Sequence, residues 1–447
     1  MQSLPVINNT PIRSNLLADL AGELSRSSAG PLPMTREEAA RRGWDELDVV
    51  FVTGDAYVDH PSFASGILGR VLEAAGYRVG IVSQPDWRNC EAWKTFGRPR
   101  LFFAVSAGNM DSMINHYTAN RKVRNDDAYS PGGRIGLRPD RATLAYCQRA
   151  REAYRGVPVI AGGVEASLRR LAHYDYWSDK VRRSILLDCK ADLLVYGMGE
   201  DAVVEIARRL DAGEAARDLR DMRGVAYLLG ASETPPDDAL ELPSFERVRD
   251  HKPSVAEATR IIHTETNPHN GRRLVQRHDR RTVVCNAPPL PVSGAAMDVI
   301  YGLPYTRRPH PAYAEPIPAH EMIKDSVTIM RGCFGGCTFC SITTHQGRII
   351  QSRSKESILG EVRRLAADPE FAGTVSDIGG PTANMYEMRC TRPEIEAICR
   401  RQSCVDPTIC KLLGTSHDPL IQVMKGAREI PGVKKVLVAS GIRMDLA

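Results

Sequence analysis

The sequence predicts an α/β fold, with a Rossmann-like parallel sheet in the N-terminal half and a partial βα barrel at the C-terminal end. The first observation is that apolar runs typical of strands alternate with helical segments of about 10–15 residues. The second is that several of these runs end in glycine-containing loops, as the strands of parallel sheets do. The third is a proline-rich stretch between the two regions. A chain of 447 residues has room for two or three domains at roughly 150 residues each.

Residues 1–45 are expected to form a polar lead-in with one short helix at "TREEAARRG". The Rossmann-like domain is expected over residues 46–230, because nearly continuous apolar runs predict strands buried on both faces. In chain order, the predicted strands are residues 48–55, 78–86, 100–108, 157–167 and 191–200. The predicted helices are residues 63–77, 142–156 and 201–213. Helices that connect successive strands favour a parallel sheet with helices on both faces.

Any ligand of this first sheet is expected at the carboxyl ends of its strands, where parallel sheets bind ligands. The candidate residues in those loops are Asp55, Asp59, His60, Gly162, Gly163, Glu165 and Glu200. The alternative is that the glycines only turn the chain, since neither "GMGE" nor "AGGVE" is the dinucleotide fingerprint GxGxxG.

Residues 231–320 are rich in proline, which breaks regular structure, and they predict a connector that packs against both regions. The final region, residues 321–447, returns to alternating strands and helices. Its predicted strands are residues 325–330, 373–380, 409–416 and 433–441. A helix is expected over residues 354–368, with Ser354 as its cap. Four βα-type units predict part of a barrel, whose site lies at the carboxyl ends of its strands.

Composition and charge argue against several classes of protein. The longest apolar runs are far shorter than the ~20 residues that a membrane helix needs, and the N-terminus shows no secretory signal. The net charge of +5 is mild and acidic residues interrupt the basic clusters, so a solvated surface is favoured over a nucleic-acid patch. The sequence therefore predicts a cytoplasmic protein without a membrane segment.

Seven of the eleven cysteines fall between residues 333 and 410. In a reducing compartment, such crowded thiols indicate a metal site more often than disulfides. Cys333, Cys337 and Cys340 have the spacing C-x3-C-x2-C, whereas a closed zinc site usually has four protein ligands. A 4Fe-4S cluster has four irons, so three thiolates leave one iron open to a small molecule. The glycines around these cysteines allow the loop to fold tightly.

A C-x3-C-x2-C loop after the first strand of a βα barrel resembles the radical S-adenosylmethionine (SAM) superfamily. Over most of the chain, including "AGGVEASLRRLAHYDYW" and "DIGGPTANMY", the sequence is similar to the YgiQ family of that superfamily. The resemblance implies that Cys333, Cys337 and Cys340 bind a 4Fe-4S cluster whose open iron binds SAM. It also implies an enzyme that cleaves SAM to a 5′-deoxyadenosyl radical, with an electron donor such as flavodoxin or ferredoxin. It does not identify the substrate.

The resemblance further implies a set of residues that contact SAM. They are Phe339, Gly379, Gly380, Pro381, Thr382, Ser440 and Arg443. Phe339 precedes the third cysteine, where the family has an aromatic residue near the adenine. The segment "GGPT" matches the family's glycine-rich segment, which receives the methionyl amino group. Ser440 and Arg443 follow the last predicted strand, where the family often contacts the ribose or carboxylate of SAM.

Two features depart from the family pattern. Many radical SAM proteins carry a cobalamin-binding domain with the motif DxHxxG, whose histidine ligates cobalt, whereas Asp59 and His60 are adjacent here. The Rossmann-like domain therefore resembles that cobalamin-binding fold without its cobalt ligand, and bound cobalamin is not expected. The chain also ends after the fourth predicted barrel strand, before the family's GxIxGxxE segment. An open sheet edge is a liability, so a fragment of a longer protein is expected.

A second group of cysteines comprises Cys390, Cys399, Cys404 and Cys410. One interpretation is a second metal site, with His417 as a further ligand. The other is a set of free thiols in an inserted loop, which is favoured because no CxxC pair occurs among them. His345 and Arg348, just beyond the first cysteine loop, lie within reach of SAM or substrate, and a structural role for each is an equal alternative.

Two other functions stay open at this point. The first is a non-catalytic iron–sulfur or zinc protein, against which the missing fourth cysteine argues, since electron transfer usually requires all four irons to have protein ligands. The second is RNA modification within the radical SAM class, against which the mild net charge argues weakly.

Overall fold

The computed structural model describes residues 30–446, so most of the predicted lead-in, residues 1–29, lies outside the described residues. The short helix predicted at the end of that lead-in is present as α2 (Arg36–Arg41). The Thr35 hydroxyl accepts from the Glu38 N–H at 3.2 Å, and the Glu38 carboxylate accepts from the Thr35 N–H at 3.1 Å. This capping box satisfies two backbone donors and explains why the helix begins there.

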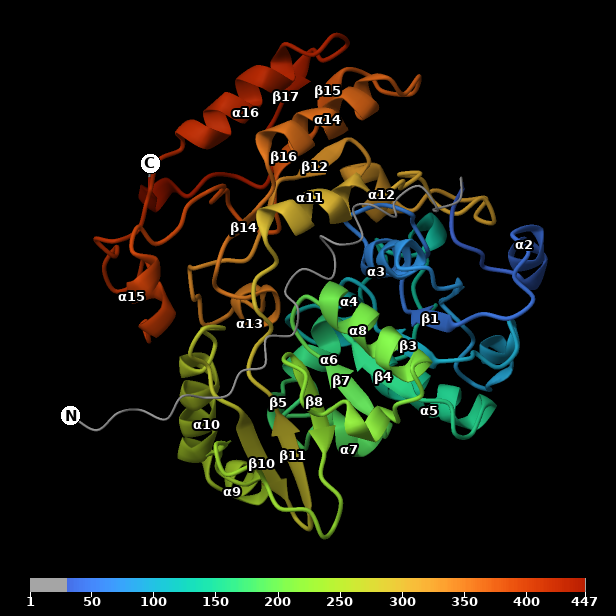
Figure 1. The fold of residues 1–447 in the computed structure, drawn as a ribbon, viewed down its shortest axis with the longest axis vertical. Helices are drawn as coiled ribbons and strands as arrows, with labels where there is room; N and C mark the ends of the chain where they lie inside the picture. The colour runs from blue at the N-terminus through green and yellow to red at the C-terminus, as the bar shows by residue number, and fades with distance from the viewer. Residues whose placement is uncertain (1–29, 447) are drawn as a thin grey trace.

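A nine-stranded sheet organises the N-terminal part of the chain (Figure 1). Its strands are β1 (Val49–Thr53), β2 (Val79–Ser83), β3 (Phe102–Ser106), β4 (Val159–Gly162), β7 (Leu193–Val195), β8 (Val225–Leu228), β9 (Leu240–Glu241), β10 (Leu274–His278) and β11 (Arg281–Cys285). Their order across the sheet is β2-β1-β3-β4-β7-β8-β11-β10-β9. Neighbours from β2 to β7 run parallel, with Val49 opposite both Val79 and Phe102. Every residue of β1 is buried, which is why continuous apolar runs predicted these strands.

Helices cover both faces of this sheet. On one face, α3 (Ala64–Ala74), α8 (Glu200–Asp211) and α11 (Gly294–Gly302) share an apolar core. On the other, α5 (Ala142–Ala153) packs against α7 (Ile185–Cys189). The remaining elements are α4 (Ser112–His116), α6 (Gly163–Leu168), α9 (Phe245–Asp250), α10 (Lys252–Thr264), α12 (Pro318–Ile323) and the hairpin of β5 (His173–Asp175) and β6 (Lys180–Arg182). No helix among the described residues is long and apolar enough to cross a membrane.

One side of the sheet differs from the prediction in two respects. The pairs β7–β8, β8–β11 and β11–β10 are antiparallel, so the sheet is mixed, with parallel pairing from β2 to β7 and between β10 and β9. Residues 240–285, expected to belong to an irregular connector, form β9–β11 together with α9 and α10. The connector predicted over residues 231–320 is therefore wrong for this segment. Its prolines flank the regular elements, and Pro253 lies in the first turn of α10, where a missing N–H costs no hydrogen bond.

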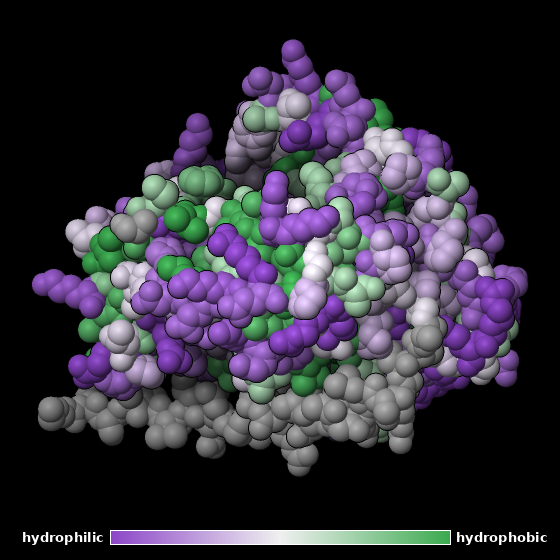
Figure 2. Space-filling model, turned by 90° about the horizontal axis from the view of Figure 1, so that it is seen from above, coloured by the Kyte–Doolittle hydropathy of each residue, from purple (hydrophilic) through white to green (hydrophobic). Residues whose placement is uncertain are grey.

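The C-terminal region is built from short strand pairs and helices with a core of their own. The pairs are β12 (Ser326–Thr328) parallel with β16 (Asp377–Gly379), β15 (Thr374–Val375) parallel with β17 (Lys435–Val436), and β13 (Met330–Arg331) antiparallel with β14 (Gln351–Ser352). The helices are α13 (Ile342–Gln346), α14 (Lys355–Ala366), α15 (Pro393–Ile398) and α16 (Asp418–Arg428). Ser354 caps α14 as predicted, accepting from the Ser357 N–H at 3.1 Å. On the face seen from above, hydrophilic and hydrophobic side chains are interspersed (Figure 2).

One predicted strand of this region is wrong. Within the described part of the chain, residues 409–416 form no strand, and only Leu413 makes an isolated bridge to Cys390. This segment is half-buried or exposed throughout, whereas a central parallel strand is buried on both faces. Residues 321–446 therefore contribute parallel strands from three βα-type units where the sequence predicts four.

A buried ion pair joins the two regions. Arg331, at the end of β13, donates from Nη1 to Glu200 Oε1 at 2.5 Å, and from Nε to the Tyr301 hydroxyl at 2.9 Å. Glu200 begins α8, directly after the loop that follows β7. The start of the cysteine loop is thereby fixed against the carboxyl edge of the first sheet.

Candidate functional site

The first cysteine loop runs from the end of β13 to the start of α13. Cys333 is buried, Cys340 is half-buried and Cys337 is exposed. The Cys333 N–H donates to the Gly347 carbonyl at 3.0 Å, and the Cys340 N–H donates to the Cys337 carbonyl at 3.1 Å. The first of these bonds holds the loop against the residue that ends α13, and the second folds the loop back on itself.

Two glycines allow this loop to fold tightly, as the sequence predicts. Gly332 has a φ of +85°, and a Cβ there would lie 2.3 Å from the Ile349 carbonyl oxygen. Gly336 has a φ of +63°, and a Cβ there would lie 2.5 Å from the Gln402 carbonyl oxygen. A side chain at either position would meet both backbone strain and a steric clash.

A third glycine, Gly335, lies between two of the sulfur atoms. Its N–H donates to Cys333 Sγ at 3.3 Å. A Cβ at Gly335 would lie 3.2 Å from Cys333 Sγ, 3.7 Å from Cys337 Sγ and 2.9 Å from Arg443 Nη1. Burial raises the pKa of the Cys333 thiol, while the Gly335 N–H and the Arg443 guanidinium oppose that shift. The loop thus surrounds a small space with two thiols, an amide donor and a cation.

The chemistry of these three thiols suits an iron–sulfur cluster. Among residues 30–446, no three Cys, His, Asp or Glu side chains meet closely enough to bind one metal ion. In a 4Fe-4S cluster each thiolate binds a different iron, so the three sulfurs need not surround one metal atom. An N–H donated to a ligand sulfur is one of the contacts that tune such clusters. Cys333, Cys337 and Cys340 therefore have suitable chemistry and suitable surroundings.

Part of the expected SAM-binding set lies beside this loop. A Cβ at Gly379 would lie 2.1 Å from Ser440 Oγ, and one at Gly380 would lie 2.8 Å from the Met330 carbonyl oxygen in β13. Arg443 reaches the space between the sulfurs, as described above. The structure therefore brings together the glycine pair, Ser440, Arg443 and the cysteine loop from three separate stretches of chain.

The other residues of that set lie apart from the sulfurs or engage their own neighbours. Phe339 is 91% exposed, and Pro381 is also exposed. The Thr382 hydroxyl donates to the Ala383 carbonyl at 3.1 Å. Contacts of Phe339, Pro381 and Thr382 with SAM stay predictions.

Sequence reasoning missed Asp377, the first residue of β16. Its Oδ1 accepts from both the N–H and the hydroxyl of Ser440, each at 3.2 Å. Burial raises the pKa of the Asp377 carboxyl. The signal was present in "DIGG", where an acidic residue lies two positions before the first glycine of the pair expected to receive an amino group.

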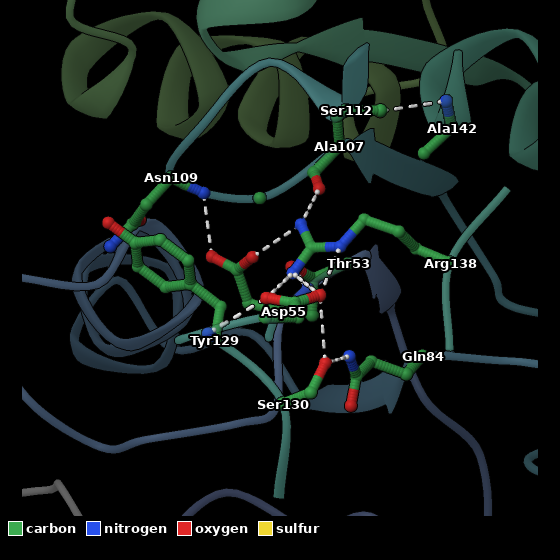
Figure 3. Close-up of polar contacts among 12 residues, drawn as sticks. Thr53, Asp55, Gln84, Ala107, Asn109, Ser112, Tyr129, Ser130, Arg138 and Ala142 are labelled. Atoms are coloured by element: carbon green, nitrogen blue, oxygen red, sulfur yellow. Dashed lines mark hydrogen bonds and ion pairs between the residues drawn. The ribbon is translucent and has the colours of Figure 1, made fainter. Parts of the chain in front are cut away.

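The carboxyl edge of the first sheet is filled by ion pairs (Figure 3). Asp55 accepts from Arg138 Nη1 at 2.9 Å and from the Asn109 N–H at 2.6 Å, and Arg138 also donates to Asp127 at 3.1 Å. Burial raises the pKa of Asp55 despite the neighbouring guanidinium. These contacts support a structural role for Asp55.

The other candidates at this edge also have partners within the chain. The partners are Arg70 for Asp59, Ser112 and Thr143 for Glu165, and Arg331 for Glu200. His60 is 1% exposed, its Nδ1 accepts from the Ser62 N–H at 3.0 Å, and burial holds its pKa well below the usual value. Gly163 has a φ of +82°, so it turns the chain, as the alternative interpretation of these glycines held.

The second group of cysteines borders one hollow of about 590 Å³. Cys390, Cys399, Cys404 and Cys410 all line it, together with Phe334 and Arg348. The Cys404 N–H donates to the Phe334 carbonyl at 3.0 Å, which attaches this segment to the first cysteine loop. His417 does not line the hollow, and no three ligand side chains of the described residues converge on a single ion.

A second pocket lies between the first sheet and the cysteine region, and we call it the interdomain pocket. Its walls include Arg170 and residues 196–198, 288–291 and 343–349. His345 and Arg348, whose roles the sequence left open, both line it. The Nδ1 atom of His345 lies 3.0 Å from the Ser167 hydroxyl oxygen, and burial lowers the pKa of this histidine to about 4.

Comparison with known sequences gives consistent matches. Residues 31–326 match the family described as "Radical SAM N-terminal". A UPF0313 protein of Rhodopseudomonas palustris is 56% identical over 94% of this chain and 66% of its own length. A UPF0313 protein of Geobacter sulfurreducens is 57% identical over 93% of this chain and 69% of its own length. The chain therefore spans about two thirds of the length of these relatives.

Among solved structures, one match is TsrM from Kitasatospora setae, a radical SAM methyltransferase with tryptophan substrate and a SAM analogue bound. It is 15% identical, with a TM-score of 0.39 over 72% of this chain and 46% of that one. A second TsrM structure, with cobalamin and a 4Fe-4S cluster bound, has a TM-score of 0.38. No inference about this chain rests on similarity this low.

Proposed function

The chain belongs to the UPF0313 family of radical SAM proteins, which confirms the predicted resemblance, and on this premise we propose that it is a radical SAM enzyme. Cys333, Cys337 and Cys340 hold a 4Fe-4S cluster and leave one iron for SAM. When bound, the cluster supplies the electron that cleaves SAM to methionine and a 5′-deoxyadenosyl radical. The observation that carries this proposal is the space beside Gly335, bordered by two thiols and the Arg443 guanidinium.

The residues near this space suit the charged groups of SAM. Asp377 and the backbone of Gly379 and Gly380 offer acceptors for the methionyl ammonium group, and Ser440 holds the Asp377 carboxylate in place. Arg443 offers a cation for the methionyl carboxylate, although it also pairs with Asp445. A side chain at Gly379 would meet the Ser440 hydroxyl and the Asp377 carboxylate, since its Cβ would lie 2.1 Å from Ser440 Oγ and 2.7 Å from Asp377 Oδ1.

The remaining assignments follow from the family resemblance. Phe339 contacts the adenine, and Pro381 and Thr382 complete the glycine-rich segment. Cys337 and Phe339 are exposed, so this side of the loop is accessible to an electron donor such as flavodoxin or ferredoxin. Eleven free cysteines suit the reducing cytoplasm, where we place the reaction. That the longer relatives act on a substrate in this way is also part of this proposal.

Anaerobic reconstitution of this chain with iron and sulfide tests this function. The variants are Cys333→Ser, Cys337→Ser and Cys340→Ser, with Cys90→Ser as the control because Cys90 lies outside both cysteine groups. We expect cluster absorbance and, once the cluster is reduced and SAM is added, 5′-deoxyadenosine from this chain and its control variant, with both lost in the three loop variants. Absorbance and product that persist in all three would overturn the proposal.

A further inference from the structure

Seven arginine residues in the described part of the chain are more than nine-tenths buried. Five of them, Arg70, Arg138, Arg169, Arg331 and Arg353, form ion pairs with an aspartate or glutamate. The other two, Arg170 and Arg348, are each 7% exposed and form no ion pair with any carboxylate in residues 30–446. A buried guanidinium without a counter-ion is costly, because the interior screens and solvates charge poorly.

Both unpaired arginines line the interdomain pocket. Arg170 donates from Nη1 to the Ser167 carbonyl, and its guanidinium carbon lies 4.4 Å from the Tyr196 ring centre. Its Nε has no hydrogen-bond partner although it is buried. The nearby Cys285 does not supply the missing negative charge, because burial raises the pKa of its thiol to about 11.

Arg348 enters the pocket from the opposite region, just after α13. Its Nη1 donates to the Arg401 carbonyl, and its Nη2 lies 3.9 Å from Cys399 Sγ. The Cys404 thiol is also close, and burial raises its pKa, which keeps it neutral near pH 7. The partners of Arg348 are therefore dipoles and sulfur atoms, as those of Arg170 are.

The other titratable groups of the pocket leave this excess positive charge in place. Glu265 is the one carboxylate in the lining, and it is already bound by Arg272 at 3.0 Å and by Arg400 at 2.8 Å. Burial lowers the pKa of His345 to about 4, so this ring is neutral near pH 7. The pocket therefore holds two guanidinium groups whose charge the described residues do not balance.

The apolar part of the lining indicates what else an occupant must have. Pro288, Pro289, Leu290 and Pro291 form one wall, and Tyr196 lies against Arg170. A small molecule with one anionic group and an apolar body matches both features.

We propose that the interdomain pocket binds a small organic anion, whose carboxylate or phosphate group contacts Arg170 and Arg348. The pocket is separate from the expected SAM set, since none of Phe339, Gly379–Thr382, Ser440 and Arg443 lines it. It is also joined to the cysteine loop, because its lining residue Gly347 accepts from the Cys333 N–H. Provided that the proposed radical SAM function holds, this anion is the class of molecule to which the substrate belongs.

Isothermal titration calorimetry on the full chain tests the anion site with three small probes that share a phenyl ring. Phenyl phosphate and benzoate each carry an anion, and benzamide is the neutral control. We expect at least one anion to bind and benzamide not to bind at the same concentration, with affinity falling as ionic strength rises. The two anions distinguish a phosphate from a carboxylate ligand. Binding of benzamide as tightly as the anions, or no binding of either anion, would refute the anion site.

Matched variants test the role of the two arginines. Arg170→Met and Arg348→Met are each expected to weaken anion binding by about tenfold or more, as loss of a charge-assisted hydrogen bond does. Arg272→Met is the control, because Arg272 lines the same pocket but already has Glu265 as its partner. Arg170→Lys keeps the charge and is expected to retain binding. It therefore shows whether Arg170→Met weakens binding because the charge is lost or because the protein no longer folds. Equal losses in Arg272→Met and Arg170→Met would contradict the assignment.

This experiment needs neither SAM nor a reduced cluster, so its failure is distinguishable from that of the proposed function. Anion binding without SAM cleavage would support the anion site and contradict the proposed radical SAM function. SAM cleavage without anion binding would support the radical SAM function and contradict the anion site.

Discussion

At the scale of single residues, the account depends on two glycines that have no side chain. Gly335 has no side chain, and that absence keeps open the space between the sulfurs of Cys333 and Cys337 and the guanidinium of Arg443. Gly379 likewise leaves room for the Ser440 hydroxyl beside Asp377. Where two thiols and a cation meet, an added methyl group competes directly with whatever the thiols bind.

The substitution Gly335→Ala tests this reading. Its Cβ would lie 3.2 Å from Cys333 Sγ and 2.9 Å from Arg443 Nη1, so we expect iron affinity to fall by roughly tenfold, as it does when second-shell contacts of metal sites are lost. Iron content after reconstitution at limiting iron measures the effect. Gly360→Ala in α14 is the control, since the nearest atom to its Cβ is a flexible arginine end at 3.9 Å. Equal iron content in the two variants would show that the space does not matter.

At the scale of elements, one buried ion pair connects β13, which leads into the cysteine loop, with α8 of the first sheet. Arg331 and Glu200 are 3% and 2% exposed at their side chains, so neither charge has water as an alternative partner. The pair gives the loop a fixed position relative to the interdomain pocket. A strand of two residues has little other means of holding that position.

Removing one partner of this pair is therefore expected to be costly. Arg331→Met leaves the Glu200 carboxylate buried and uncompensated, which lowers the free energy of unfolding by about 3–5 kcal/mol. The control is Arg277→Met, which breaks an ion pair with Glu241 whose two side chains are 59% and 57% exposed. That loss is expected to stay under about 1 kcal/mol. Urea unfolding measures both, and similar values for the two variants would contradict the structural role of the buried pair.

The edge of the first sheet contains a residue that makes stability depend on pH. His278, at the end of β10, is 3% exposed, stacks on Phe245, and has a pKa lowered to about 4 by burial. The unfolded chain binds the proton near pH 6.5. Between these values the unfolded state holds more protons than the folded state, so the free energy of unfolding decreases as pH falls, by about 2 kcal/mol from pH 7 to pH 5.

The substitution His278→Phe removes this titration and is expected to reduce the loss of stability in that pH range. Urea unfolding at pH 7 and pH 5 measures the difference. His269→Gln is the control, because it also removes one histidine but at an exposed position. A His278→Phe variant as acid-sensitive as the wild type would show that another group is responsible.

At the scale of the whole molecule, the first sheet and the cysteine region enclose a pocket that neither forms alone. Its lining comes from the loop after β7, the proline segment 288–291 and the residues around α13. The carboxyl edge near β1 and β3 is closed by ion pairs (Figure 3), whereas residues of the loop after β7 line this pocket. We propose that SAM binds at the cysteine loop and that an organic anion binds in the pocket.

Much of this arrangement is predictable from the sequence, for physical reasons. β1 to β4 and β7 are buried on both faces, so their apolar runs identify them, and the cysteine spacing marks its loop without any knowledge of the fold. β9 to β11 were missed because the prolines that flank them were taken as a sign of irregular structure. The strand expected at residues 409–416 was wrong because local apolar content does not show whether sheet neighbours exist. Arg170 was missed because an unpaired buried charge is visible only when all its neighbours are known.

The central claim is that the three-cysteine loop leaves one iron open for SAM. Electron paramagnetic resonance of the reduced, reconstituted protein, recorded before and after addition of SAM, tests it most directly. The account predicts that SAM changes the spectrum of the wild type, because the open iron gains new ligands, and that Cys340→Ser gives no 4Fe-4S signal to change. A wild-type 4Fe-4S spectrum that stays the same at saturating SAM would contradict the claim.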